Sequence, residues 1–270
     1  MKLTFIGGGN MASALIAGLA GKLLDGANIH VVDPNADALA RLAQQYGVST
    51  ATAMGESVTG SDVIVLAVKP QQMREVAAAL APLLGQALVV SIAAGIRARD
   101  LSRWLGGHQA IVRCMPNTPA LIGQGITGMV AMEDVSAAQK ATADAVLRAV
   151  GATVWLDDEA LIDPVTAVSG SGPAYVFFFI EAMQQAALEL GLTPEQANAL
   201  ALATFTGAAQ LAAQSDEPVA LLRERVTSKG GTTYAAITSM EQAGVKQAII
   251  DAVKAAAARG KELGEQMGAD

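Results

Sequence analysis

The stretch LTFIGGGNMA, residues 3–12, decides the fold that this sequence predicts. Four residues suited to a strand precede three glycines, and the residues after them repeat small and apolar side chains at a helical period. A strand, a glycine turn and a helix in this order make the spacing Gly7-x-Gly9-x-x-Ala12 a dinucleotide-binding fingerprint. Gly7 permits the tight turn, Gly9 lets a pyrophosphate approach the backbone, and Ala12 allows close packing of helix on strand. We therefore expect this loop to hold a dinucleotide.

Strand and helix patterns alternate after this unit through the first 158 residues. The apolar runs are continuous, as in strands buried on both faces of a parallel sheet. Such alternation predicts an α/β fold with a Rossmann-like, doubly wound and mainly parallel sheet. The expected strands are residues 3–6, 29–32, 62–68, 87–93, 110–115, 126–132 and 153–156, and the expected helices between them are residues 35–41, 71–84, 97–105 and 136–150.

The carboxyl ends of these strands mark the expected cofactor cleft, because ligands of such sheets bind there. These ends are residues 7–11, Asp33, Lys69 with Pro70, Ala93 with Ala94, and Pro116 with Asn117.

Asp33 stands about twenty residues beyond the glycines, where a carboxylate can accept a hydrogen bond from a ribose 2′-hydroxyl. Alternatively, Asp33 caps the helix that follows Pro34. The sequence leaves both roles open.

The strand signals stop beyond Asp157, and only helical patterns follow. Thr193 and Gln196 form a predicted capping box at the start of one of these helices. We expect a dinucleotide-binding domain over residues 1–158 and an all-helical substrate-binding and dimerisation domain over residues 159–270.

Two glycine-containing motifs interrupt the helical half. In SGSGPAY, residues 169–175, Pro173 suits the first position of a helix, and the small residues before it let a ligand approach closely. A tight interhelical turn without a ligand is the alternative. In VTSKGGTT, residues 226–233, the glycine pair before two threonines makes a nest of backbone donors suited to a carboxylate. Lys229 either adds positive charge there or is simply solvated.

Composition excludes several classes of function. The net charge of −7 and the absence of a Lys/Arg cluster argue against a nucleic-acid partner. Charged or amide side chains break every apolar run of membrane-spanning length, and no leader is evident, so we expect a cytoplasmic protein. A single cysteine, Cys114, excludes an intrachain disulfide and a cysteine-based zinc site, and we expect no metal. The hydrophobic fraction of 52% favours a homo-oligomer.

The motifs together resemble those of the pyrroline-5-carboxylate reductase family. The resemblance runs from residue 3 to about residue 265, and the two glycine motifs of the helical half are its most specific part. The segments that carry it are GGGNM (residues 7–11), AVKP (67–70), RCMPNTP (113–119), SGSGPAY (169–175) and TSKGGTT (227–233).

The resemblance implies NAD(P)H-dependent reduction of the cyclic imine 1-pyrroline-5-carboxylate to L-proline, the last step of proline biosynthesis. It also implies a helical domain that interlocks two subunits, as a dimer or a pentamer of dimers. The implied cofactor-binding residues are Gly7, Gly8, Gly9, Asn10, Met11, Ala67, Val68, Lys69, Pro70 and Asn117, which lies near the nicotinamide. The implied substrate-binding residues are Val226, Ser228, Gly231, Thr232 and Thr233, and the Thr233 hydroxyl is the catalytic group beside the ring nitrogen.

Asp33 departs from a common pattern of this family, because a 2′-phosphate usually requires Arg or neutral hydrogen bonders at that position. The next Arg after Asp33 is Arg41. NADP, as NADPH, is the cofactor that the resemblance implies, and NAD, as NADH, is a serious contender.

Hydride transfer to an imine needs alignment more than a strong acid. Both histidines, His30 in an expected strand and His108 in a loop, are interpreted as structural. A second candidate is a related reductase acting on another imine or a 2-hydroxy acid. Such enzymes carry a catalytic Lys on the long helix, and residues 173–190 contain none. A non-catalytic nucleotide sensor is a third candidate, but a sensor has no need of a carboxylate nest.

Overall fold

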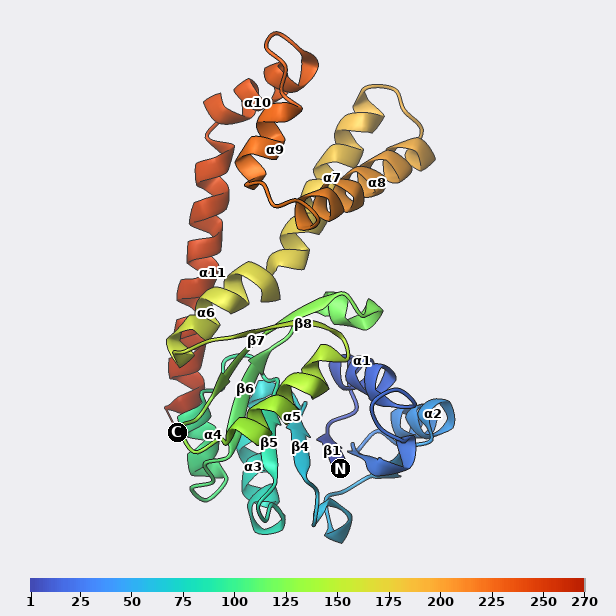
Figure 1. Cartoon of the computed structure of the whole chain (residues 1–270), viewed down its shortest axis with the longest axis vertical. Coiled ribbons are helices and arrows are strands. Elements are labelled where there is room, and N and C mark those ends of the chain that lie inside the picture. The colour runs from blue at the N-terminus through green and yellow to red at the C-terminus, as the bar shows by residue number, and fades with distance from the viewer. Residues whose placement is uncertain (270) are drawn as a thin grey trace. The chain divides into compact units, whose positions relative to one another are not determined.

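The structure, a computed structural model, describes residues 1–269 (Figure 1). Its sheet has eight strands in the order β3-β2-β1-β4-β5-β6-β7-β8. Every neighbouring pair is parallel except β6 and β7, which pair antiparallel from Val112 opposite Ala131 to Met115 opposite Gly128. The predicted doubly wound, mainly parallel sheet is therefore confirmed. The strands are β1 (Leu3–Ile6), β2 (Ile29–Val32), β3 (Ser49–Ala51), β4 (Val63–Leu66), β5 (Leu88–Ser91), β6 (Ile111–Met115), β7 (Gly125–Ala131) and β8 (Gly151–Trp155).

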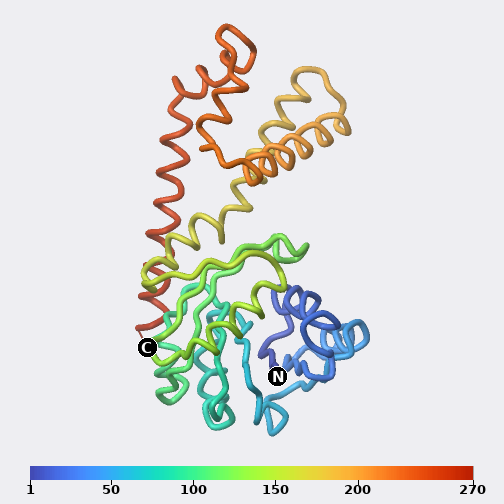
Figure 2. Tube along the Cα trace, viewed as in Figure 1, coloured from blue at the N-terminus to red at the C-terminus, as the bar shows by residue number. Residues whose placement is uncertain are grey.

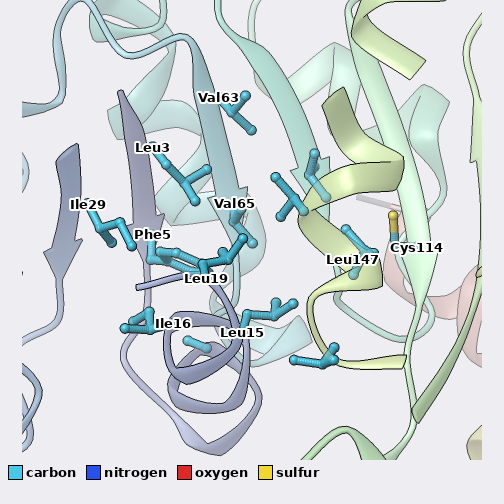
Figure 3. Close-up of a cluster of buried hydrophobic side chains, with 14 of the residues drawn as sticks. Leu3, Phe5, Leu15, Ile16, Leu19, Ile29, Val63, Val65, Cys114 and Leu147 are labelled. Carbon is cyan, nitrogen blue, oxygen red and sulfur yellow. The ribbon is translucent and has the colours of Figure 1, made fainter. Parts of the chain in front are cut away.

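Helices cover both faces of the sheet. Leu3 and Phe5 of β1 point into one apolar cluster, in which Leu15, Ile16 and Leu19 of α1 pack against them (Figure 3). Ile6 belongs to the cluster of the opposite face, because successive strand residues point to opposite sides. The helices with the first cluster are α1 (Asn10–Leu19), α2 (Ala36–Tyr46) and α5 (Ala137–Arg148), and those with the second are α3 (Met73–Leu80) and α4 (Ala98–Trp104).

Short 3-10 turns complete the connections. They are η1 (Gly26–Asn28), η2 (Glu56–Val58), η3 (Pro70–Gln72), η4 (Ala81–Leu83), η5 (Thr118–Ile122) and η6 (Glu159–Leu161).

The chain forms two compact units. Unit 1 contains Met1–Ser171 and the chain from Ala256 onward, and unit 2 is Gly172–Ala255. The expected domains, residues 1–158 and 159–270, stay a prediction. Unit 1 thus consists of two separate stretches of the sequence.

Unit 2 is helical and buries very little by itself. Its buried apolar residues are Ala197 and Ala201 of α8, and α7 buries none. The predicted capping box is confirmed: Thr193 accepts a hydrogen bond from the amide of Gln196 at 3.3 Å, and Gln196 accepts one from the amide of Thr193 at 3.0 Å. The helices are α7 (Gly172–Glu189), α8 (Pro194–Ala213), α9 (Val219–Arg225), α10 (Thr232–Gln242) and the first part of α11 (Val245–Gly268).

The last turns of α11 belong to unit 1. Met267 packs against the second apolar cluster, Arg97 lies 3.5 Å from Glu265, and Arg103 donates to the carbonyl oxygen of Gly268 at 3.0 Å. A Cβ on Gly264 would lie 3.2 Å from Nε of Arg97, so the absent side chain lets the helix approach closely.

The stretch before α7 differs from its sequence-based interpretation. We expected a glycine-softened loop with a helix starting at Pro173. Instead, α6 (Ile162–Val165) passes directly into the π-helical turn η7 (Thr166–Gly170), and α7 begins at Gly172 (Figure 2). Ser169 and Gly170 therefore lie in the π-helical turn, Ser171 follows it, and Gly172 is the first residue of α7.

Candidate active site

Gly7 brings the first two cofactor loops together. Its φ of +103° suits glycine alone, and a Cβ built there would lie 2.6 Å from the carbonyl oxygen of Ala67. The amide of Gly7 donates to Val32 at 2.8 Å, and the amide of Ala67 donates to Ile6 at 2.8 Å. The loops of residues 7–11 and 67–70 are therefore neighbours at the carboxyl edge of the sheet.

Gly9 leaves the start of α1 open to an anion. It is the N-cap residue, it offers no side-chain cap, and nothing lies within 4 Å of a Cβ built on it. The first amides of a helix have no acceptors within the helix and attract negative charge. Gly9 and Asn10 are exposed and Met11 is half-buried. This arrangement fits the pyrophosphate of a dinucleotide.

Asp33 is held by the backbone at the end of β2. Its Oδ2 accepts from the amide of Gly8 at 2.7 Å, and its Oδ1 accepts from the amide of Asn35 at 2.8 Å. The interpretation of Asp33 as the cap of the next helix is wrong: Asn35 caps α2, accepting from the amide of Ala38 at 3.1 Å. The bond to Gly8 couples Asp33 to the glycine loop, and sequence reasoning missed it because only the tertiary fold brings the two together.

The loops after β5 and β6 extend the same edge. The amide of Ile92 donates to Leu66 at 3.1 Å, and beyond it Ala93 is buried while Ala94 is exposed. Asn117 follows β6 and is 9% exposed. The structure thus gathers the predicted cofactor residues of unit 1 along the ends of β1, β2, β4, β5 and β6.

The predicted substrate residues form one turn in unit 2, between α9 and α10. Gly230 has a φ of +77°, and the amide of Gly231 donates to Ser228 at 3.0 Å, which closes the turn. Gly231 is the N-cap of α10 and offers no side-chain cap. Consequently the first amides of α10, from Thr232 onward, point out of the helix without acceptors inside it.

The side chains of this turn face solvent in the single chain. Val226 is 64% exposed, and Ser228, Thr232 and Thr233 are exposed as well. The hydroxyl of Thr227 is used locally, since it donates to the carbonyl of Arg223 at 2.6 Å. The turn therefore offers two threonine hydroxyls and a set of backbone donors.

The histidines and the cysteine have structural surroundings. His30 on β2 shares a hydrogen bond of 2.9 Å with the Ser49 hydroxyl, and His108 shares one of 2.9 Å with the carbonyl of Ala87. Burial lowers the pKa of His30, the charge of Lys2 lowers it further, and the bond with Ser49 opposes both. Burial raises the pKa of the Cys114 thiol far above its usual range. These groups lie outside the predicted cofactor and substrate residues.

Metal clusters and membrane-spanning helices are both absent from the described residues, 1–269. These residues contain no group of three or more His, Cys, Asp or Glu side chains placed to hold a metal ion. Within the same residues, no helix is both long and apolar enough to cross a membrane.

Comparison with curated proteins decides the family. The chain is 49% identical over 268 residues to the pyrroline-5-carboxylate reductase of Pseudomonas aeruginosa, covering 99% of this chain and 98% of that protein. The chain belongs to the pyrroline-5-carboxylate reductase family. Residues 159–263 match the family model for pyrroline-5-carboxylate reductase dimerisation, and residues 2–95 match the model described as NADP oxidoreductase coenzyme F420-dependent.

Solved structures of pyrroline-5-carboxylate reductases share the whole fold. That from Coxiella burnetii has a TM-score of 0.92 and 42% identity, covering 97% of this chain and 98% of that one. A pyrroline carboxylate reductase of Plasmodium falciparum, crystallised with NADP bound, has a TM-score of 0.87 and 31% identity, covering 98% of both chains. The family that the motifs indicated is therefore confirmed, together with its dimerisation domain.

Proposed function

We propose that this chain reduces 1-pyrroline-5-carboxylate to L-proline, the last step of proline biosynthesis, with NADPH as hydride donor. The observation that carries the proposal is the open turn before α10, which offers free backbone donors and two threonine hydroxyls, in a chain that also has a dinucleotide loop. Neither a related reductase with a catalytic Lys nor a nucleotide sensor accounts for both features.

Each loop of unit 1 that carries cofactor residues contacts a different part of the dinucleotide. The amides at the start of α1 and residues Gly7, Gly8, Gly9, Asn10 and Met11 hold the pyrophosphate. Residues Ala67, Val68, Lys69 and Pro70 line the adenosine side, and Asn117 lies near the nicotinamide. Ala93 and Ala94 complete the cofactor cleft at the end of β5. Two observations support this assignment. Gly7 lies so close to Ala67 that an added Cβ would clash with it, and the start of α1 has no side-chain cap and is open.

The chemistry requires alignment of the imine carbon with the hydride donor. When bound, the reduced nicotinamide supplies the hydride. Backbone donors at Thr232 and Thr233 hold the substrate carboxylate, and Val226, Ser228 and Gly231 complete the pocket wall. The amide of Gly231, which the glycine pair suggested as a further donor, is already used within the turn, where it donates to Ser228. The Thr233 hydroxyl accepts a hydrogen bond from the protonated ring nitrogen and orients the C=N bond. A protonated imine is already electrophilic, so positioning contributes most of the rate enhancement.

The assembly that we propose is a homodimer, or a pentamer of such dimers, working in the cytoplasm. The many exposed apolar side chains of unit 2, among them Phe177 and Phe178 at 64% and 71% exposure, support burial against a second chain. These side chains lie within residues 159–263, the segment that matches the family model for dimerisation.

Thr233→Ala tests the substrate site. We expect turnover to fall by about 10- to 100-fold, because one oriented hydrogen bond in the transition state is lost. The affinity for NADPH, measured by nicotinamide fluorescence, should stay nearly unchanged. Thr233→Ser keeps the hydroxyl and is the matched control. Full activity of Thr233→Ala at limiting substrate would disprove the assigned role.

Asp33 tests the choice between NADPH and NADH. A carboxylate beside the ribose accepts from a 2′-hydroxyl and repels a 2′-phosphate. No ion pair of the described residues includes Asp33, so its charge is not neutralised by a neighbouring cation. We expect both cofactors to support activity, and Asp33→Ser to raise kcat/KM for NADPH relative to NADH by about tenfold. The assay follows absorbance at the nicotinamide band with either cofactor; an unchanged ratio would contradict the role.

A further inference from the structure

The π-helical turn η7 leaves a carbonyl in need of a donor. The amide of Ser171 donates to Thr166 at 2.8 Å, five residues back. The carbonyl of Ser169 would, in an α-helix, accept from the amide of residue 173, but Pro173 has no N–H. A buried or half-buried carbonyl without a donor costs free energy, so the partner of Ser169 matters.

Asn117 supplies that donor. Its Nδ2 donates to the carbonyl of Ser169 at 3.1 Å, and its Oδ1 accepts from the amide of Ile126 at 2.9 Å. The two bonds fix the orientation of the Asn117 side-chain amide, because its nitrogen must face the Ser169 carbonyl and its oxygen must face the Ile126 N–H. Asn117 thus ties the turn of residues 166–170 to the end of β6 and the start of β7.

Close packing adds to this attachment. A Cβ on Gly170 would lie 2.6 Å from Cε of Met115, the last residue of β6, and a Cβ on Gly128 would lie 2.7 Å from Cγ1 of Val165. Glycine at position 170 therefore lets the turn approach β6, and glycine at position 128 of β7 lets Val165, just before the turn, approach that strand. β6 is parallel to β5, so its carboxyl end lies at the same edge as the cofactor loops.

We propose that Asn117, besides its place among the cofactor residues, is a positioning residue for hydride transfer that acts through its hydrogen bond to Ser169. This inference rests on the proposed function. Asn117, Ser169 and Ile126 all lie in unit 1, so the two bonds hold residues 166–170 against the carboxyl end of β6, at the edge where the cofactor loops lie. Loss of the bond to Ser169 lowers kcat because this part of the site is no longer held in place, while the cofactor loops of residues 7–11 and 67–70 remain intact.

The experiment compares Asn117→Asp, Asn117→Ala, Pro173→Ala and the double variant Asn117→Ala/Pro173→Ala in the full chain. Asp keeps an acceptor for Ile126 but places a carboxylate against the carbonyl of Ser169. For Asn117→Asp and for Asn117→Ala we expect kcat to fall about tenfold, while the KM for NADPH stays within about twofold of the wild-type value. Pro173→Ala alone stays within about twofold of wild type. In the double variant, the amide of residue 173 supplies the missing donor, so kcat recovers at least half of the logarithmic loss of Asn117→Ala.

Two results would overturn the inference. One is a wild-type kcat in Asn117→Asp. The other is a double variant whose kcat is no higher than that of Asn117→Ala, a comparison that also decides the matter if Asn117→Asp does not fold. A wild-type chain that fails to reduce the imine would instead refute the proposed function, so the two failures are distinguishable.

Discussion

Unit 1 and unit 2 solve the problem of burying apolar side chains in different ways. In unit 1 each of β1, β2, β4 and β5 is buried along its whole length, with helices over both faces. In unit 2 the long helix α7 has no buried residue, although its sequence contains three consecutive phenylalanines. A sheet with two covered faces completes its core within one chain, whereas a layer of helices with exposed apolar faces requires a second one. The difference places fold stability in unit 1 and assembly in unit 2.

The largest effect should follow from emptying the core of unit 1. Phe5→Ala removes a fully buried ring from β1, and we expect the free energy of unfolding to fall by about 3–5 kcal/mol. Trp104 and Trp155, the two tryptophans, both lie in unit 1, so tryptophan fluorescence during denaturant unfolding reports on this unit. Leu23→Ala, at a side chain 50% exposed, is the control. A loss below about 1 kcal/mol for Phe5→Ala would contradict the assignment of the core.

An intermediate effect should follow from charging the exposed face of unit 2. Phe178→Glu places a charge where we expect the second chain, and the dimer dissociation constant should rise by at least about a hundredfold. Light scattering measures the mass, and tryptophan fluorescence should show an unchanged unit 1. Leu23→Glu puts the same charge on unit 1 as the control. If Phe178→Glu keeps the dimer mass at all concentrations, the division of roles between the units is wrong.

The smallest effect compares one local device in both units. Ser136 caps α5 in unit 1 and Thr193 caps α8 in unit 2, each paired with a Gln three residues on. Replacing either by Ala should reduce helix stability by about 1 kcal/mol. Amide hydrogen exchange should detect both losses in the dimer. In the Phe178→Glu background only the Ser136→Ala loss should persist, since α8 then exchanges rapidly in any case; equal protection of α8 in both backgrounds would count against the comparison.

The sequence predicted the sheet of unit 1 well because its strands are apolar and its turns carry glycine. It missed β3, since Ser49 and Thr50 are exposed and three residues give no period. The antiparallel direction of β7 also escaped the pattern, although the nine residues between Met115 and Gly125 are too few for a helical crossover. Around the π-helical turn of residues 166–170, Gly170 packs against Met115 and the preceding Val165 packs against Gly128, and no local sequence pattern reveals these contacts.

For the candidate site, the motifs located the loops but not the bonds between them. Gly7 and Gly230 were predictable, because their φ values of +103° and +77° favour glycine locally. The contact of Asp33 with Gly8 and that of Asn117 with Ser169 join positions 25 and 52 residues apart, and so depend on the completed sheet. The roles of Thr233 and of the other substrate residues stay predictions.

The path of α11 has a consequence for anyone who wishes to recombine such proteins. Because this single helix starts in one unit and finishes in the other, unit 1 is encoded by two separated pieces of sequence. A truncated gene ending at residue 171 would lack Met267 and the partner of Arg97, leaving an apolar hole and an orphaned guanidinium. Exchange of nucleotide-binding modules between homologues would therefore succeed only as a two-segment graft, with the terminal helical turns taken from the same donor as the sheet.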